Sequence, residues 1–240
     1  MILEQEFKVG IKDIGINNKM TNIAFLSFLQ EIGCYHSDLA GFGINDIERT
    51  RKAWLLTDWK LQVLDRPKYG DKIKVKTWAR PIEKNNFYTY RDFEMYNGTK
   101  KVAIASSKWV LFDVNLKKIV RITDEIHSNY EPENIRVFEE DFEKIKVIEN
   151  FTINKSYEVQ RADIDINKHM HNLNYLKVAY EILPEKVFFN LESNNVRIMY
   201  KHQILLGSKI NCNYYMLNNK HIVTMKSEDN KILHAVIELF

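Results

Sequence analysis

The chain has 240 residues, of which 45% are hydrophobic and 12% aromatic, and this composition excludes an intrinsically disordered protein. Its net charge of +3 is too mild to indicate a nucleic-acid-binding protein, and no apolar run is long enough to predict a membrane-spanning helix. The two cysteines, Cys34 and Cys212, form neither a disulfide framework nor a metal-ligand spacing, so a reducing cytoplasm is the simplest compartment.

The first half of the chain predicts one strand, one helix and then a run of strands. Residues 7–11 alternate between apolar and other side chains, which indicates a short strand. Residues 23–40 are apolar on nearly all helical faces, which indicates a helix surrounded by other structure. Four strands are expected after it, at residues 54–63, 72–78, 87–95 and 102–112. The dipeptide Asn97-Gly98 predicts a hairpin between the last two.

The second half repeats this order of elements. Residues 157–159 indicate a strand, and a helical stripe over residues 172–183 ends before Pro184. Four more strands are expected, at residues 196–204, 209–216, 221–226 and 232–240. Elements in this order predict an α+β fold in which an antiparallel sheet curves around a helix.

The segment between the halves, residues 115–154, is acidic and lacks a regular pattern, so we expect it to cross the protein surface. We place the first domain at residues 1–130, the linker at residues 131–154 and the second domain at residues 155–240.

The chain also repeats itself in sequence. Residues 159–176 match residues 9–26 at a constant offset of 150, with eight identical positions out of 18 and no gap. A period this long indicates two copies of a whole domain rather than a solenoid. The offset falls to 137 between Gly70 and Gly207, so the first half holds 13 additional residues, which we expect within residues 38–52.

The two copies differ in chemistry at the loop before the helix. Asp165 and His169 stand where the first copy has Gly15 and Lys19, and the amide Asn167 is common to both copies. An acid, an amide and an imidazole together suit acyl transfer to water, in which the imidazole or the carboxylate takes a proton from water and the amide orients it. One half therefore keeps a candidate reaction site, and its twin keeps only the scaffold.

A purely structural role is the alternative, because Asp and Asn are common cap and loop residues before helices. Capping would be needed equally in both halves, so the loss of the acid and the imidazole from the first half favours the catalytic interpretation. The unpaired backbone N–H groups at the start of the helix at residues 172–183 are expected to hold the oxyanion of such a reaction.

The segment at residues 165–175, DINKHMHNLNY, resembles the DxNxHxNNxxY signature of acyl-[acyl carrier protein] thioesterases of plant plastid and bacterial type. Residues 53–78 and 105–110 are similar to the N-terminal half of that family. The resemblance implies two tandem hot-dog domains, each an antiparallel sheet wrapped around a central helix, paired as an internal pseudo-dimer. It also implies hydrolysis of an acyl thioester on a phosphopantetheine arm without a cofactor. The degenerate first half is then the place for acyl-chain selection.

The resemblance assigns four catalytic residues: Asp165, Asn167, His169 and Gln203. Gln203 departs from the family, which has Glu there, because an amide can hold a water molecule but cannot accept its proton. His171 replaces the family's Asn, and Ile204 stands where some members have a cysteine. Cys212 is too far along the strand to substitute for it and is expected to be a small buried hydrophobe.

By the same resemblance the partner is an acidic acyl carrier protein, and no cofactor or metal is implied. Its candidate docking residues are basic: Arg49, Arg51, Lys52, Lys117, Lys118 and Arg121. Three alternatives stay open: an acyl-CoA thioesterase, a non-catalytic acyl-binding or regulatory hot-dog protein, and a dehydratase of the same fold. The sequence leaves acyl-chain length and oligomeric state open.

Overall fold

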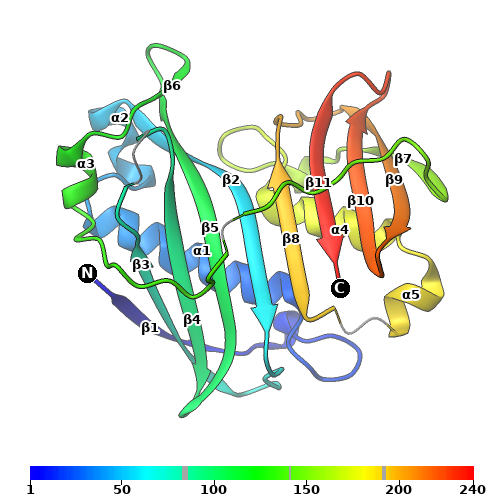
Figure 1. The fold of residues 1–240 in the computed structure, drawn as a ribbon, viewed down its shortest axis with the longest axis horizontal. Coiled ribbons are helices and arrows are strands. Elements are labelled where there is room, and N and C mark those ends of the chain that lie inside the picture. The colour runs from blue at the N-terminus through cyan, green and yellow to red at the C-terminus, as the bar shows by residue number, and fades with distance from the viewer. Residues whose placement is uncertain (83–85, 141, 191–192) are drawn as a thin grey trace. The chain divides into compact units, whose positions relative to one another are not determined.

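The computed structural model describes residues 1–82, 86–140, 142–190 and 193–240 (Figure 1). It divides into two compact units, which we call unit 1 (Met1–Asp141) and unit 2 (Phe142–Phe240). Each unit contains one long helix and an antiparallel sheet. No helix of the described residues is both long and apolar enough to span a membrane.

Unit 1 begins with a strand and the longer of the two central helices. In chain order its elements are β1 (Leu3–Lys8), η1 (Ile11–Asp13), α1 (Asn22–Leu39), η2 (Ile44–Asp46), α2 (Ile47–Thr50), β2 (Lys52–Val63), β3 (Lys72–Ala79), β4 (Thr89–Asn97), β5 (Lys100–Asp113), β6 (Lys118–Val120) and α3 (Asp124–Ser128). The strands are ordered β1-β3-β4-β5-β2, all neighbours are antiparallel, and β6 pairs with the end of β5. Helix α1 packs against β1 and β3.

Unit 2 repeats this plan with shorter elements. They are β7 (Ile153–Glu158), η3 (Arg161–Asp163), α4 (Asn172–Ile182), α5 (Glu185–Asn190), β8 (Asn195–Tyr200), β9 (Lys209–Leu217), β10 (Lys220–Ser227) and β11 (Leu233–Leu239). The strand order is β8-β11-β10-β9-β7, again antiparallel throughout, and α4 contacts β7, β9 and β11. Each unit is therefore an antiparallel sheet around one helix, as the sequence predicts.

The two central helices lie within one residue of their predicted positions because their cores are strongly apolar. Thr21 caps α1 by accepting a hydrogen bond from the Ala24 N–H at 3.2 Å. Leu26 in α1 and Leu176 in α4 occupy equivalent repeat positions, and both are fully buried. Burial of one leucine side chain contributes roughly 1.5–3 kcal/mol.

Besides β7, which covers Ile153–Glu158 rather than residues 157–159, two predicted strand boundaries were wrong, each for a local reason. β1 covers Leu3–Lys8 rather than residues 7–11, because the Asp13 carboxylate accepts the Gly10 N–H at 2.8 Å and turns the chain into η1. β8 ends at Tyr200 rather than at residue 204, so the segment after it is a loop. This second correction changes the surroundings of Gln203.

The expectation of an irregular surface segment at residues 115–154 was also wrong in part. It contains β6 and α3, and Tyr130 directly after α3 is buried. In unit 1 the segment lies against the sheet, because the Trp78 indole N–H donates to the Ile135 carbonyl at 3.0 Å. In unit 2, Ile145 is buried against the sheet. Residue 141, within the expected linker, lies outside the described residues.

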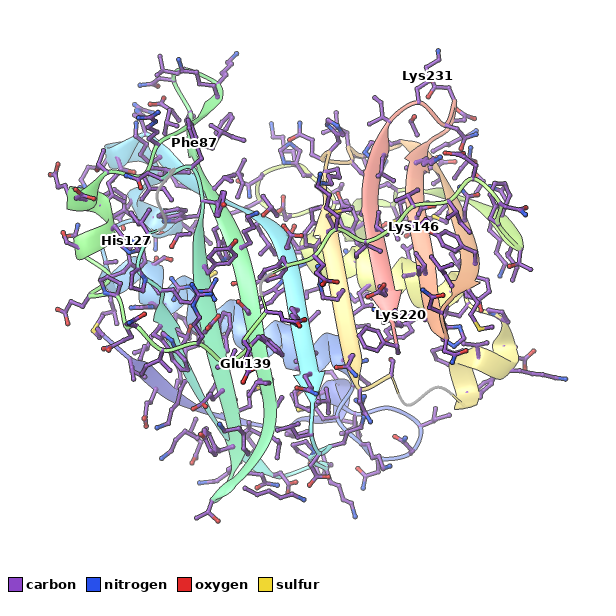
Figure 2. The ribbon with its side chains drawn as sticks, in the orientation of Figure 1. Phe87, His127, Glu139, Lys146, Lys220 and Lys231 are labelled. Carbon is purple, nitrogen blue, oxygen red and sulfur yellow. The ribbon has the colours of Figure 1, made fainter. Side chains whose placement is uncertain are left out.

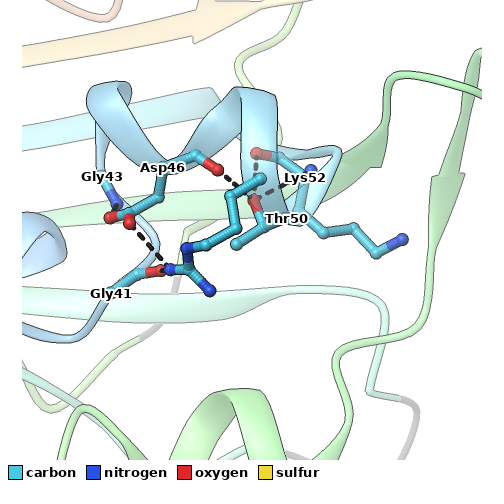
Figure 3. A network of polar contacts seen from close by, with 6 residues as sticks. Gly41, Gly43, Asp46, Thr50 and Lys52 are labelled. Atoms are coloured by element: carbon cyan, nitrogen blue, oxygen red, sulfur yellow. Dashed lines mark hydrogen bonds and ion pairs between the residues drawn. The ribbon is translucent and has the colours of Figure 1, made fainter.

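The additional residues of unit 1 lie in α1, which has 18 residues against 11 in α4, and in β2, which has 12 residues against six in β8. The expectation that they lie within residues 38–52 was wrong, because unit 2 has a counterpart of equal length for the connection from α1 to β2. Figure 3 shows how this connection is held: Arg49 donates to the Gly41 carbonyl at 2.8 Å and to Asp46 at 2.7 Å, and Asp46 accepts the Gly43 N–H at 3.1 Å. A Cβ atom at Gly43 would overlap the Asp38 carboxylate, so only glycine fits there.

Candidate active site

The predicted site residues of unit 2 lie in the loop between η3 and α4. A β-bridge between Ile164 and Met170 closes this loop, which we call the motif loop (residues 164–171). The Asp165 and His169 side chains are half-buried, and Asn167 is exposed. The loop therefore presents all three side chains within one short turn of chain.

Asp165 organises the motif loop through its carboxylate. Its Oδ1 atom accepts the Asn167 N–H at 2.8 Å and the His169 N–H at 3.2 Å. Its Oδ2 atom lies 3.5 Å from the Asn167 side-chain nitrogen, a long contact. Because the loop occupies Oδ1, Oδ2 is the oxygen that can accept a hydrogen bond from water or substrate.

Gln203 lies in a second loop that pairs with the motif loop. The sequence places it in a strand, but β8 ends at Tyr200 and Gln203 is exposed. The Met170 N–H donates to the Ile204 carbonyl at 2.8 Å, and His169 forms a β-bridge with Leu205. These two contacts bring the segment that carries Gln203 alongside the segment that carries His169, so the four predicted residues belong to one pair of adjacent loops.

The start of α4 differs from the expectation of free backbone donors. His171 is the N-cap residue, and its Nδ1 atom accepts the Leu173 N–H at 3.2 Å. The Asn174 N–H donates to the His171 carbonyl at 2.8 Å. The Leu173 and Asn174 amides are thus occupied within the protein and are not free to hold an oxyanion, and an oxyanion role for the start of α4 stays a prediction.

Three residues that sequence reasoning missed support the motif loop. The Asp163 carboxylate accepts the Tyr157 hydroxyl at 2.6 Å and the Gln160 N–H at 2.8 Å. The Tyr200 hydroxyl donates to the Asn172 carbonyl at 2.9 Å. Identity of Asp163 with Asp13 in the repeat was the available signal for the first of these roles.

Tyr175, the tyrosine of the motif, packs edge-on against Tyr200 with ring centroids 5.2 Å apart. Burial raises the pKa of Tyr175 to about 12, so its hydroxyl stays protonated near neutral pH. Burial also raises the pKa of Cys212 to about 12, which leaves this thiol a weak nucleophile and agrees with its predicted role as a buried hydrophobe.

Unit 1 builds the same loop without the acid and the imidazole. The Gly15 N–H donates to the Lys19 carbonyl at 2.9 Å, as the Asp165 N–H donates to the His169 carbonyl at 2.9 Å. The Met20 N–H donates to a neighbouring loop in unit 1, as the Met170 N–H does in unit 2. The backbone shape of the loop therefore does not depend on Asp165 or His169.

The acceptor of the Met20 N–H is the Pro67 carbonyl, at 2.7 Å, so Pro67 is the counterpart of Ile204 and Arg66 is the counterpart of Gln203. The Arg66 guanidinium donates to the Met20 carbonyl and to the Asn22 side-chain oxygen, both at 2.9 Å. In unit 1 a cation thus lies at the place that corresponds to Gln203, where a proton acceptor would be needed.

Solved structures share this fold over nearly the full chain. An acyl-ACP thioesterase from Bacteroides thetaiotaomicron has a TM-score of 0.89 and 19% identity, covering 100% of this chain and 97% of that one. A 12:0-ACP thioesterase from Umbellularia californica has a TM-score of 0.86 and 17% identity, covering 99% and 96%. The predicted α+β class with tandem hot-dog units is thereby confirmed, and their pairing as a pseudo-dimer stays a prediction.

The family models agree in both halves. The one described as the acyl-ACP thioesterase N-terminal domain matches residues 1–130, and the one described as the acyl-ACP thioesterase C-terminal domain matches residues 145–237. The chain belongs to the acyl-ACP thioesterase family.

Curated relatives are distant and longer. An oleoyl-acyl carrier protein thioesterase of Arabidopsis thaliana is 25% identical over 83% of this chain and 59% of its own length. A palmitoyl-acyl carrier protein thioesterase of Cuphea hookeriana is 24% identical over 85% of this chain and 52% of its own length. The chain thus spans between half and three-fifths of these relatives.

Proposed function

We propose that the protein hydrolyses the thioester of acyl-[acyl carrier protein], releases a free fatty acid and so terminates fatty acid synthesis. Membership of the acyl-ACP thioesterase family supports the reaction class. The location that we propose is the cytoplasm, and both cysteines are unpaired thiols.

One observation carries the proposal: the motif loop forms in unit 1 with Gly15 and Lys19 in place of Asp165 and His169. Since the fold does not need the acid and the imidazole, a chemical task is the better explanation for their presence in unit 2. A half-buried imidazole on the same short loop as a carboxylate with one available oxygen is suited to draw a proton from water.

The proposed roles follow from the contacts. Asp165 and His169 position and activate the water molecule, and Asn167 orients water or substrate through its side-chain amide. Gln203 assists from the adjacent loop by hydrogen bonding, because its amide cannot accept a proton. No step requires a cofactor.

The experiment is thiol release from a panel of acyl-carrier thioesters of different chain lengths. Asp165→Asn keeps the Oδ1 acceptor of the loop but removes the proton acceptor, and His169→Lys installs the residue that unit 1 tolerates. Loss of a positioned acid or base typically costs about 10²–10⁴-fold in rate, and we expect both variants to fall in that range. The control is Asn17→Ala in unit 1, which should leave turnover unchanged while Asn167→Ala lowers it.

Absence of wild-type turnover at every chain length would contradict the proposal. The second candidate, a non-catalytic acyl-binding or regulatory protein, would then be favoured, and Gln203 in place of an acid is the observation that supports it. Equal kcat/KM for acyl-CoA and acyl-carrier substrates would instead favour the acyl-CoA thioesterase.

We further propose that the carrier docks on unit 1. Two basic segments far apart in sequence meet at one end of its sheet, because Lys52 in β2 and Lys118 in β6 both pair in register with Asp113 in β5. Lys52 is bound to Asp113 at 2.5 Å, so the exposed Arg51 and Lys118 are the better docking candidates. This end also carries an exposed aromatic ring, which Figure 2 labels as Phe87.

Selection of the acyl chain is the role that we propose for unit 1 itself. Its motif loop lacks the acid and the imidazole, and Arg66 is bonded to the start of α1. Unit 1 nevertheless keeps a large apolar interior that includes Phe25, Trp59 and Phe93. Unit 1, with an apolar core and a degenerate site, is therefore suited to contact the acyl chain of the substrate rather than its thioester.

A further inference from the structure

The N-cap of α4 is a histidine, and this gives the start of the helix a property that its twin lacks. The His171 Nδ1 atom accepts the Leu173 N–H at 3.2 Å, and in unit 1 the Thr21 hydroxyl oxygen accepts the Ala24 N–H at the same distance. A hydroxyl oxygen keeps its lone pairs over the whole ordinary pH range. An imidazole nitrogen loses its lone pair when the ring is protonated.

The cap determines the tautomer of His171. Because Nδ1 accepts a hydrogen bond, it cannot carry the proton of the neutral ring, which must therefore lie on Nε2. Protonation of the ring would place its second N–H hydrogen on Nδ1, pointing at the Leu173 N–H group whose hydrogen bond Nδ1 accepts in the neutral form. It would also add positive charge at the N-terminus of a helix, where the macrodipole disfavours it.

The backbone N–H and carbonyl groups of His171 both form hydrogen bonds, one to the segment before the motif loop and one to α4. Its N–H donates to the Asp163 carbonyl at 2.7 Å, and its carbonyl accepts the Asn174 N–H at 2.8 Å. The Asn174 side chain donates to the same Asp163 carbonyl at 3.0 Å. A change at this residue therefore acts directly on the segment that carries Asp165 and His169.

We propose that His171 is a positioning residue whose neutral, Nε2-protonated form caps α4 and orders the motif loop, and whose protonation releases the cap and lowers activity at acidic pH. The inference rests on the proposed hydrolase function for its effect on turnover. Its structural part, the tautomer and the cap, stands independently of turnover.

The charges around His171 act in both directions. Asp165 on the motif loop favours the protonated ring, and Lys177 on α4 opposes it. Asp163 turns its carboxylate to Tyr157 and Gln160. The same elements and the adjacent loop carry further titratable groups: Arg161 in η3, Lys168 and His169 in the motif loop, Tyr175, Tyr180 and Glu181 in α4, Tyr200 in β8, and Lys201 and His202 in the loop after it. Burial is the largest influence and lowers the pKa of His171 below its ordinary value of 6.5.

The first test is spectroscopic and needs no substrate. Two-bond ¹H–¹⁵N correlation spectra of the wild-type protein should show His171 with its proton on Nε2 and a pKa below 6.5. Hydrogen exchange at the Leu173 amide should accelerate as the pH falls through that pKa. Either of two results would overturn the proposal: a proton on Nδ1 in the neutral ring, or a Leu173 amide exchange rate that shows no change as His171 titrates.

The second test is the pH profile of kcat/KM. Asn and Thr side chains cap helices without titrating, so His171→Asn and His171→Thr should keep activity at neutral pH. Both variants should lose the acid limb of the profile, which is the decrease of kcat/KM at low pH that accompanies protonation of His171. His171→Ala removes the cap at every pH and should lower kcat about fivefold throughout. The matched control, Thr21→Ala, removes the twin cap and should leave the acid limb in place.

If His171→Asn keeps the same acid limb as the wild type, another group controls it and the switch is refuted. A protein without turnover on any thioester would refute the hydrolase instead. The exchange and tautomer measurements would still decide whether His171 caps α4 in the proposed way.

Discussion

The Met170 N–H donates a hydrogen bond of 2.8 Å to the Ile204 carbonyl. This bond holds the loop after β8 against the motif loop, and it has a counterpart of 2.7 Å from the Met20 N–H to the Pro67 carbonyl in unit 1. It places Gln203 beside the candidate site although Gln203 is outside any strand. The nature of this side chain should therefore affect catalysis without affecting the fold.

We expect Gln203→Glu to match or exceed wild-type kcat/KM, by up to about 10²-fold, because a carboxylate can accept a proton from water and an amide cannot. Gln203→Ala should lower kcat/KM by less than Asp165→Asn does. Thiol release from the same acyl-carrier substrate measures all three. A tenfold or larger decrease in the Glu variant would show that the glutamine is itself required.

Much of the fold could be predicted from the sequence, because its signals are local and strong. The apolar stripe of residues 23–40 and the repeat at residues 159–176 identified both central helices and their equivalence. Short elements were missed, since β6 has three residues and α3 has five, too few to show a period. They depend instead on contacts made only after folding, such as the pairing of β6 with β5.

The site was predicted unevenly for a related reason. Asp165, Asn167 and His169 are neighbours in sequence, so one motif placed them together. Gln203 came from family resemblance alone, and its loop position depends on the backbone bond between Met170 and Ile204. The donors at the start of α4 were expected to be free because no sequence rule shows that a histidine cap occupies one of them.

The two equivalent core leucines provide a test of how the units unfold. Leu26→Ala and Leu176→Ala should each cost about 2–5 kcal/mol, since both side chains are fully buried. We expect hydrogen exchange to accelerate mainly within the unit that carries the substitution. The control is Leu64→Ala, at a position 52% exposed, with an effect below about 0.5 kcal/mol. Equal acceleration in both units after either core substitution would indicate one cooperative unit instead.

Stability should also depend on the pH through His36. This ring is fully buried and its Nδ1 atom contacts the Arg91 guanidinium. Burial, assisted by Arg91, lowers the pKa of His36 to about 3. Between pH 6.5 and about 3 the unfolded chain therefore binds a proton that the folded chain does not, so the free energy of unfolding falls as the pH is lowered through this window, by at most about 1.4 kcal/mol per pH unit.

Urea unfolding at several pH values between 7 and 4.5 checks this contribution. His36→Gln removes the titrating ring and keeps an acceptor for Arg91, so its stability should fall less steeply with acid than that of the wild type. Burial also lowers the pKa values of His127 and His234, so part of the slope should persist in the variant. Identical slopes for wild type and variant would mean that His36 does not contribute.

Docking of the carrier protein should depend on salt. The exposed Arg51 and Lys118 lie at one end of the unit 1 sheet, and attraction between solvent-exposed charges weakens as the Debye length falls from about 10 Å at 0.1 M to about 3 Å at 1 M. KM for the acyl-carrier substrate should thus rise with salt, while KM for a small acyl thioester such as an acyl-N-acetylcysteamine stays constant.

Arg51→Glu and Lys118→Glu should each raise KM for the carrier substrate several-fold, with kcat unchanged and a weaker salt dependence. Lys231→Glu, at a cation 81% exposed in unit 2, is the matched control. If the control raises KM as much as the unit 1 variants, net charge rather than this surface attracts the carrier.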